Sequence, residues 1–249
     1  STVRIWETHA DKNELLPSGD RPWREGHVTG RLHLAFSQDG TLLAATKDLR
    51  KVALVDFVSG TTRRILDAGS AIETVCFSPD GVRIAVGSAS GLHIWETATG
   101  QRLHQRSGRV RALAFSPDGK QFFVNNRHDI EIYRAEDFSV QGVIEEESLP
   151  AVGNKSAIDI LVVSPDGRYL AIKDGAFLGA LHVWDLHRKQ LHASFRWTRW
   201  FTNLAFSPDG KTLAASGGSW FNARSEGTTK LWNVETRQEL ATVRAHDGL

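Results

Sequence analysis

The sequence predicts an all-β fold made of repeated four-stranded antiparallel sheets, and two recurring patterns support this prediction. The first is a five-residue turn of the form Phe-Ser-Pro-Asp-Gly, which occurs unchanged at 77–81, 115–119 and 206–210 of the 249 residues. Two further copies differ at one position each, with Gln38 in 36–40 and Val163 in 163–167. The second is a short β-rich run that closes on an aromatic residue. Both patterns recur roughly every 40 residues, a period typical of repeat architectures.

Each five-residue turn is predicted to join the first two strands of a unit. Proline sets φ near −65°, aspartate can hydrogen-bond its own backbone, and glycine takes the positive φ that reverses the chain. An apolar run follows each copy, for example at 41–45 and 168–172. Each unit therefore begins with a β-hairpin. The turn aspartates are assigned a structural role: Asp39, Asp80, Asp118, Asp166 and Asp209.

The run that closes on an aromatic residue is predicted to be the third strand of each unit. One weaker copy carries Val55 at the aromatic position, and the other copies carry Trp6, Trp95, Tyr133, Trp184 and Trp232. A buried tryptophan covers roughly 150–250 Å², which at about 25 cal/mol per Å² gives an upper limit of several kcal/mol per sheet. A small turn and a fourth strand follow. Four strands in roughly 40 residues are typical of a β-propeller blade.

The alternation of these turns with strand ends such as Ile-Trp-Glu at 94–96 and Val-Trp-Asp at 183–185 resembles WD-repeat β-propellers. The resemblance covers essentially the whole chain. Blades of that family build a side-chain network on the histidine of a Gly-His dipeptide, which survives at 26–27 and as Ala-His at 245–246. These blades are therefore expected to depend on apolar packing instead. Degenerate repeats of this kind resemble those of bacterial WD-repeat proteins, where such arrays are often joined to a serine/threonine kinase or a signalling NTPase.

The chain is predicted to be a single, partial propeller. Its repeats delimit five complete blades, at roughly residues 27–68, 69–107, 108–148, 149–196 and 197–244. A partial blade is expected at 1–26 and the start of another repeat at 245–249, as in an excerpt of a longer array. A hairpin beyond Leu249 could complete six blades with residues 1–8, or further whole repeats could give about seven or more. Open end sheets would expose apolar faces, so the chain is expected to be poorly soluble or to self-associate.

The composition bounds the possible partners and the location of the chain. Thirty basic and 29 acidic residues give a net charge of +1, so no global field attracts nucleic acid or an anionic membrane. No run approaches the length of apolar sequence that spans a bilayer. The one cysteine, Cys76, lies in a predicted strand and is interpreted as a buried thiol. This usage suits a reducing compartment, and a cytoplasmic location is expected.

The sequence predicts no catalytic site, no cofactor and no metal centre. It lacks the common motifs of metalloproteases, nucleophilic hydrolases, P-loop proteins and dinucleotide-binding proteins. His93 and His182 occupy equivalent positions of different repeats, and the turn aspartates are dispersed in the same way. Equivalent positions of a repeat are distributed around a ring, so these side chains are not expected to converge on one metal ion or one substrate.

The candidate partner-binding residues lie where the repeat is interrupted. By the resemblance, the connections between blades and those between second and third strands share one face, opposite the turns. Tryptophan and arginine dominate protein-interface hot spots. The candidates are Trp23, Arg24, Trp197, Arg199, Trp200, Phe201, Trp220, Phe221 and Arg224. The alternative is that these tryptophans cap the inner ends of blades or plug a central channel. An acidic run at 145–147 on the same face is interpreted as a solvated loop or as a steering patch for a basic partner.

The predicted function is a non-catalytic protein-interaction scaffold that binds a protein or peptide, within a larger multidomain signalling protein. Fold alone does not fix function, so two alternatives stay open. One is a ligand or nucleic-acid sensor in which Trp197, Trp200 and Trp220 stack on bases. The other is a propeller enzyme with a site at the channel mouth. Salt-dependent binding to single strands would favour the sensor, and selective capture of a protein would favour the scaffold.

Overall fold

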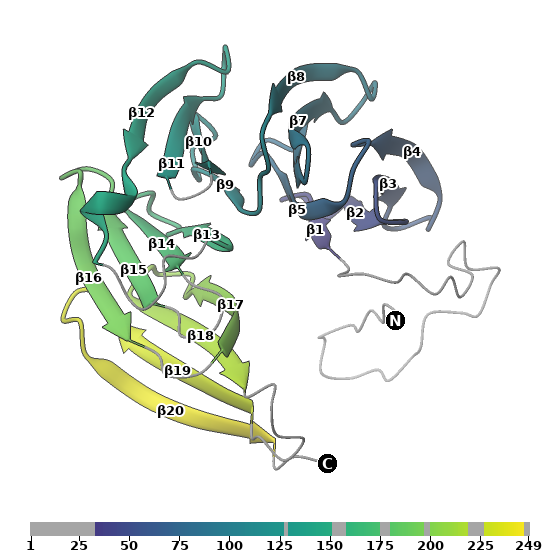
Figure 1. The fold of residues 1–249 in the computed structure, drawn as a ribbon. Coiled ribbons are helices and arrows are strands. Elements are labelled where there is room, and N and C mark those ends of the chain that lie inside the picture. The colour runs from purple at the N-terminus through teal and green to yellow at the C-terminus, as the bar shows by residue number, and fades with distance from the viewer. Residues whose placement is uncertain are drawn as a thin grey trace.

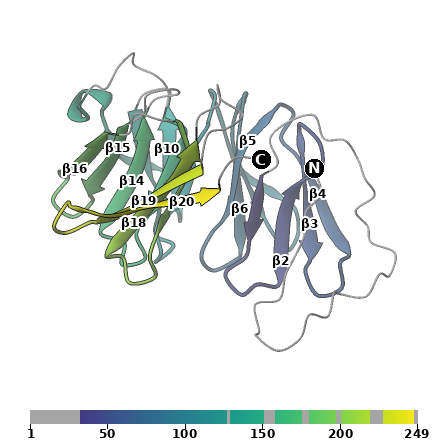
Figure 2. The same cartoon turned by 90° about the horizontal axis from the view of Figure 1, so that it is seen from below.

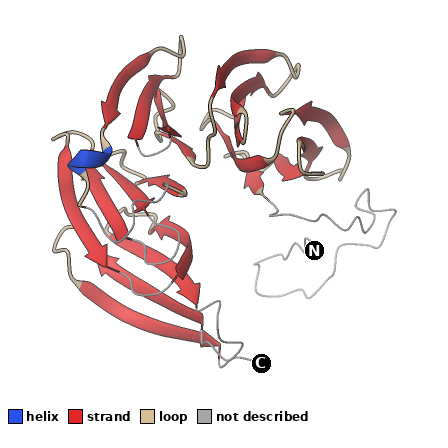
Figure 3. Ribbon diagram, viewed as in Figure 1, coloured by secondary structure: helices blue, strands red, loops and turns tan. Residues whose placement is uncertain are grey.

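A computed structural model describes residues 33–126, 129–150, 158–174, 180–196, 200–218 and 227–246. Within these ranges the chain forms twenty β-strands and one short 3-10 helix, η1 (Glu146–Ser148). Figure 3 shows that strands make up nearly all of the regular structure. The partial blade expected at 1–26 and most of the additional repeat expected at 245–249 lie outside the described residues.

The strands form five four-stranded antiparallel sheets, each with its strands in sequence order. The first contains β1 (Leu34–Phe36), β2 (Leu42–Thr46), β3 (Lys51–Asp56) and β4 (Thr62–Asp67). The second contains β5 (Ile72–Phe77), β6 (Arg83–Ser88), β7 (Gly91–Glu96) and β8 (Arg102–Ser107). The third contains β9 (Leu113–Phe115), β10 (Gln121–Asn126), β11 (Asp129–Arg134) and β12 (Val140–Ile144).

The last two sheets follow the same plan. The fourth contains β13 (Ile160–Val163), β14 (Tyr169–Asp174), β15 (Ala180–Asp185) and β16 (Gln190–Arg196). The fifth contains β17 (Trp200–Phe206), β18 (Thr212–Gly218), β19 (Gly227–Asn233) and β20 (Glu239–His246). Ala245 and His246 thus belong to a fourth strand.

The sheets stand side by side in an arc, as the blades of a propeller do (Figure 1). Each first strand contacts the first strand of the next sheet, from β1 through β5, β9 and β13 to β17. The fourth strands lie at the periphery (Figure 1). The predicted fold class, an all-β propeller of four-stranded antiparallel blades, is confirmed.

The five-residue turns lie together on one face of the arc, which we call the turn face. A Cβ atom at Gly119 would lie 3.7 Å from Pro79, and one at Gly167 would lie 3.8 Å from Pro117. Both glycines have φ near +70°, which L side chains rarely adopt. These turns therefore contact the turn of the preceding sheet, and glycine is required for the backbone conformation.

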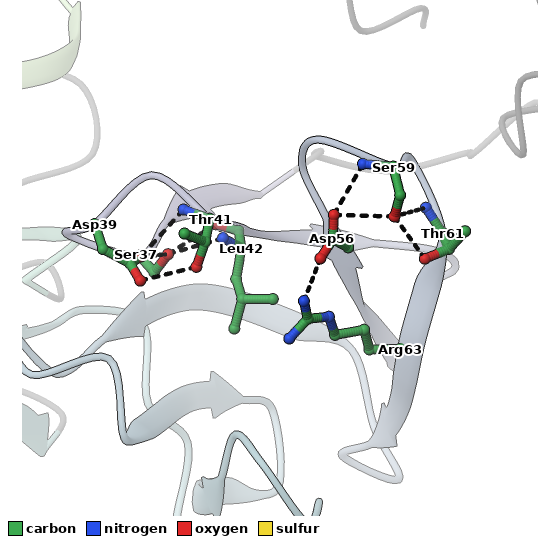
Figure 4. Close-up of polar contacts among 8 residues, drawn as sticks. All are labelled: Ser37, Asp39, Thr41, Leu42, Asp56, Ser59, Thr61 and Arg63. Carbon is green, nitrogen blue, oxygen red and sulfur yellow. Dashed lines mark hydrogen bonds and ion pairs between the residues drawn. The ribbon is translucent and has the colours of Figure 1, made fainter.

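Side-chain hydrogen bonds close each five-residue turn, and Figure 4 shows those of the first turn. In the first, Ser37 Oγ donates to the carboxylate of Asp39, which accepts the N–H of Thr41 at 3.0 Å. The N–H of Leu42 then donates to Ser37 Oγ at 2.9 Å. These hydrogen bonds lower the pKa of Asp39 below its usual value. The largest contribution comes from the Ser37 hydroxyl, and the N–H and hydroxyl of Thr41 contribute the next largest. The other four turns repeat the serine–aspartate hydrogen bond at the turn aspartates that were assigned a structural role.

Apolar side chains fill the space between neighbouring sheets. The aromatic residue of each third strand packs against the preceding sheet: Trp95 on the first, Tyr133 on the second, Trp184 on the third and Trp232 on the fourth. The rings of Trp232 and Phe195 stack at 5.1 Å. In the first sheet Val55 packs with Leu43, Ala53 and Phe57 instead. The aromatic positions that were assigned a structural role are buried wherever the structure describes them; Trp6 lies outside the described residues.

The expectation that the blades depend on apolar packing alone is incomplete. The residue two positions before the aromatic is polar and buried or half-buried in several sheets. His93 Nε2 lies 3.3 Å from Ser88 Oγ, and the His93 ring stacks on Trp95 at 5.4 Å. In the third sheet, Glu131 accepts from Asn126 at 2.8 Å and from the Tyr133 hydroxyl at 2.7 Å. Local polar pairs thus accompany the apolar packing, because each buried polar group requires a partner.

Three segments predicted as loops are more ordered than expected. β16 runs through Arg196 and β17 begins at Trp200, so only 197–199 separate the two strands. The hairpin insertion is also shorter, because Gly217 and Gly218 pair with Phe201 and Trp200 and therefore continue β18. Cross-strand pairing decides strand length here, in place of the weak preference of glycine. In the acidic run, residues 146–148 form η1, and the Glu146 N–H donates to Asp129 at 2.9 Å.

The two end sheets of the described array expose apolar side chains that are buried elsewhere. Phe36 is 51% exposed, whereas the equivalent Phe77 is 9% exposed. Val243 is 49% exposed, whereas the equivalent Phe195 is 9% exposed. Each free face is equivalent to a face that packs on a neighbouring sheet inside the array. Exposed apolar sheet faces favour association.

We therefore expect the isolated chain to self-associate through its end sheets. The double variant Phe36→Glu, Val243→Glu should shift the chain towards monomer, because a charge on either face opposes its burial. Sedimentation velocity across a concentration series measures this. The matched control is Val140→Glu, since Val140 is 52% exposed but belongs to the third sheet, which has a neighbouring sheet on each side. A wild-type chain that is monomeric at every concentration would contradict the prediction.

Candidate interaction surface

The strands run between the turn face and an opposite face, and Figure 2 shows them from a perpendicular direction. We call the opposite face the connection face. It carries the connections between sheets and those between second and third strands, because both leave from the strand ends that are distant from the five-residue turns. This is the face on which the sequence predicts partner binding.

Most of the predicted partner-binding residues lie outside the described residues. These are Trp23, Arg24, Trp197, Arg199, Trp220, Phe221 and Arg224. Trp200 and Phe201 are the first two residues of β17, at its connection-face end, and are therefore strand residues where a loop was expected. Whether the nine residues form one patch, and whether the tryptophans cap blades or contact a partner, stays a prediction.

A row of paired charges follows the inner edge of the connection face. Glu73 accepts from Arg109 Nε at 3.0 Å and from Arg109 Nη2 at 2.5 Å. Further along, Asp159 Oδ1 lies 3.5 Å from Arg111 Nη1, and Asp159 Oδ2 lies 3.2 Å from Lys173 Nζ. We call these five residues the charged rim. It spans the second, third and fourth sheets and places two arginines between two carboxylates, with Lys173 beyond Asp159.

The sequence analysis did not predict the charged rim, although charged residues at equivalent positions of successive repeats indicate it. Glu73, Arg111 and Asp159 each stand four residues before the first residue of a five-residue turn. Equivalent positions of adjacent repeats lie side by side at the inner edge, so opposite charges at successive copies can meet. The rim is only partly in water, since the Lys173 side chain is 4% exposed and that of Asp159 is 24% exposed.

A buried asparagine positions the central part of the rim. Asn125, the fifth residue of β10, is 1% exposed. Its Oδ1 accepts the N–H groups of Arg111 at 2.7 Å and Ala112 at 2.9 Å. Its Nδ2 donates to the carbonyl of Ile158 at 3.1 Å, which connects the third sheet to the fourth. Asn125 therefore fixes the backbone on both sides of the Arg111–Asp159 pair.

The remaining chemistry of the described residues is dispersed. No group of three or more His, Cys, Asp and Glu side chains in the described ranges is arranged to hold a metal ion. His93 and His182 lie in separate sheets. Burial raises the pKa of the Cys76 thiol in β5. A search of the same residues finds no helix with the length and apolar character needed to cross a bilayer.

Comparison with known proteins supports the repeat assignment. The chain matches the WD40 family (WD domain, G-beta repeat) over residues 60–96 and 189–233. It is 24% identical over 213 residues to the protein LST8 homolog of Drosophila melanogaster, covering 81% of this chain and 51% of that protein. The chain thus spans about half the length of this curated relative.

Solved structures show the same architecture. Kuenenia stuttgartiensis hydrazine synthase superposes with a TM-score of 0.71 at 17% identity, covering 89% of this chain and 68% of the other. The Cps50 (Swd1) β-propeller domain of Myceliophteria thermophila gives 0.70 at 14% identity, covering 88% and 76%. Sequence identities this low show only that the fold is shared. The function is not shown in this way, since hydrazine synthase is by its name an enzyme. Five radial sheets, recurrent aromatic third strands and two matched repeats together show that this chain is a β-propeller that contains WD40 repeats.

Proposed function

We propose that this chain is a non-catalytic protein-interaction propeller that presents its connection face to a protein or peptide partner. WD-repeat propellers are typically interaction scaffolds, which gives the class of function. The observation that carries the proposal is the charged rim, because its pairs are held at strand ends by the fold. Because these side chains are already held in place, little conformational entropy is lost when a partner binds them.

The pattern of the rim indicates how the partner is selected. A fixed order of positive and negative charges favours a partner surface with the complementary order and opposes others, so the rim contributes more to specificity than to affinity. The aromatic and arginine residues predicted on the same face would supply apolar contact area. We infer that the rim sets the register of the partner while these residues contribute most of the binding free energy.

We also propose that the chain belongs to a larger cytoplasmic signalling protein of bacterial type. The match to a relative of about twice the aligned length supports a larger protein. The degenerate Phe-Ser-Pro-Asp-Gly repeats support the bacterial and signalling parts of the proposal, by resemblance.

The proposed function is tested by exchanging one charge pair of the rim. In the variant Glu73→Arg, Arg109→Glu the ion pair is kept but its direction is reversed. We expect the free energy of unfolding to change by less than about 1 kcal/mol, because these side chains are partly exposed. Affinity for the partner should fall about tenfold or more, because like charges then face each other.

The measurement begins with crosslinking and mass spectrometry to identify the partner, followed by calorimetry with the purified pair. The control variant is Lys211→Glu, Glu235→Lys, which exchanges charges on the turn face. Equal partner affinity for the wild type and the rim variant would contradict this proposal. Salt-dependent binding of single-stranded nucleic acid, with no protein captured, would instead favour the sensor alternative.

A further inference from the structure

The turn face holds a cavity between the second and third sheets, separate from the proposed connection-face site. Its volume is about 610 Å³, within the range of ligand-binding pockets. The walls come from the start of β6, the third five-residue turn, the turn between β11 and β12, and β12 itself. The charged side chains that line it are Arg83, Asp118, Lys120, Arg134 and Glu136.

Arg83 is the most informative of these residues. Its side chain lies over the ring of Phe138, with Cζ 5.5 Å from the ring centroid, and Nη1 donates to the carbonyl of Ala135 at 2.6 Å. An arginine carries five N–H donors. Among the described residues no carboxylate lies within ion-pair distance of Arg83. The guanidinium is thus held half-buried at the cavity wall, with most of its donors uncommitted.

The third sheet also departs from the repeat at one position. The residue after the aromatic is an acid in the first, second and fourth sheets: Asp56, Glu96 and Asp185. In the fourth sheet Asp185 lies 3.6 Å from Arg168, the residue that follows the turn glycine. The third sheet has Lys120 after the turn glycine, but Arg134 stands in place of the acid. The Arg168–Asp185 ion pair of the fourth sheet thus corresponds to two positive residues in the third sheet, Lys120 and Arg134, which line the same cavity as Arg83.

The carboxylates of the cavity do not neutralise this group. Asp118 accepts from Ser116 Oγ and from the Lys120 N–H at 3.0 Å, so its nearer oxygen is committed to its own turn, and Lys120 Nζ stays 3.9 Å from the other. Arg134 Nη1 is 3.3 Å from Asp137, and both side chains are about half exposed, so this pair is weak. Glu136 is exposed at the cavity and opposes an anionic ligand there.

We propose that this cavity binds a carboxylate side chain of an acidic peptide segment in a protein partner. Arg83 would form the innermost contact, and Lys120 and Arg134 would flank the bound carboxylate. The Gln121 and Gln141 amides, paired at 2.8 Å on the wall, suit peptide groups. Gln141 lies in β12, the outermost strand of its sheet, which has a free edge for an extended peptide.

A peptide fits these features better than a polyanion. The net charge of the chain is only +1, which does not provide the strong field that holds nucleic acids. The cavity lining contains both positive and negative side chains. Glu136 would therefore repel a continuous row of phosphates more than it repels separate carboxylates on a neutral peptide backbone. The site therefore favours a partner segment with separated acidic residues.

The test is fluorescence anisotropy with a labelled peptide of alternating glutamate and serine, measured on the full chain. The decisive variant is Arg134→Asp, which restores the acid found in other sheets and places it next to Lys120. This change should leave the melting temperature unchanged or higher. We expect it to weaken peptide binding about tenfold or more, through loss of one cation and gain of one anion.

Two single-charge variants with matched controls make the test specific to the cavity. Lys120→Gln should weaken binding about threefold or more and Glu136→Gln should strengthen it, each through one charge. The controls are Lys211→Gln and Glu235→Gln, which alter the equivalent positions of the fifth sheet and should have little effect. Equal effects of site and control variants, or no effect of Arg134→Asp, would overturn the proposal. Binding of single-stranded nucleic acid but not of peptide, lost in Arg134→Asp, would also overturn it.

Discussion

Replacing Asn125 by leucine is expected to lower the free energy of unfolding by about 3 kcal/mol or more. The side chains are similar in size, so the change removes hydrogen bonds without leaving a large cavity. It leaves the N–H groups of Arg111 and Ala112 and the carbonyl of Ile158 without their partner. Each unsatisfied buried polar group costs about 1–3 kcal/mol, which is why a single substitution has so large an effect.

Denaturant unfolding followed by tryptophan fluorescence measures this loss. The matched control is Asn203→Leu, since Asn203 is an exposed asparagine of β17 and its replacement should change stability by no more than about 0.5 kcal/mol. The charged rim provides a second readout, because the two backbone segments that carry Arg111 and Asp159 lose their connection. Equal stabilities of the two variants would show that the asparagine does not link the sheets.

Lowering the pH is expected to destabilise the chain through His182. This residue of β15 is fully buried, its Nδ1 lies 3.0 Å from Ser194 Oγ, and its Nε2 has no partner among the described residues. Burial lowers the pKa of His182 from 6.5 to about 4. The unfolded chain therefore takes up a proton at this residue near pH 6.5, whereas the folded chain does so only near pH 4.

The stability contributed by neutral His182 is thus complete above pH 6.5 and is lost as the pH falls towards 4. The difference in pKa corresponds to about 3 kcal/mol. Unfolding at a series of pH values should show this loss in the wild type and a smaller one in His182→Gln. Exposed His187→Gln is the control and should keep the wild-type pH dependence. Burial also lowers the pKa of His93 and of His104, which is why the informative quantity is the difference between variants. A proton titration of His182 near 6.5, followed by NMR, would contradict this expectation.

The recurrent turns and third strands could be predicted because their chemistry is local. Proline, aspartate and glycine determine the reversal at 79–81 within a few bonds of one another. An aromatic residue at the end of a β-rich run is buried in any sheet that packs on another. These signals were repeated along the chain, so the blade architecture followed from them.

The polar surfaces could not be predicted in the same way. Arg111 meets Asp159 across two sheets, and Arg83 meets the carbonyl of Ala135, 52 residues later. Neither pair has a signal within a few residues along the chain, and the repeat spacing of Arg111 and Asp159 becomes informative only once the sheets are known to be adjacent. The buried pair of Ser88 and His93 also has no local signal, because the two residues belong to different strands and meet across the hairpin.

The positions at which strands end also differ between the sequence prediction and the structure. Sequence preference places Gly217 and Gly218 in a loop, but pairing with Phe201 and Trp200 continues the strand. Each further hydrogen bond of the β17–β18 hairpin stabilises the extended strand. This stabilisation exceeds the weak preference of glycine for non-strand conformations.

By itself, the sequence determined the period of the repeat, the five turns and the side chains that become the core, because turn chemistry and alternating burial act over a few residues. Only the tertiary structure decided which charges meet at the rim, which cations gather in the turn-face cavity, and where the strands end. Those outcomes depend on how neighbouring sheets are placed against each other, and that placement brings together residues that are distant along the chain.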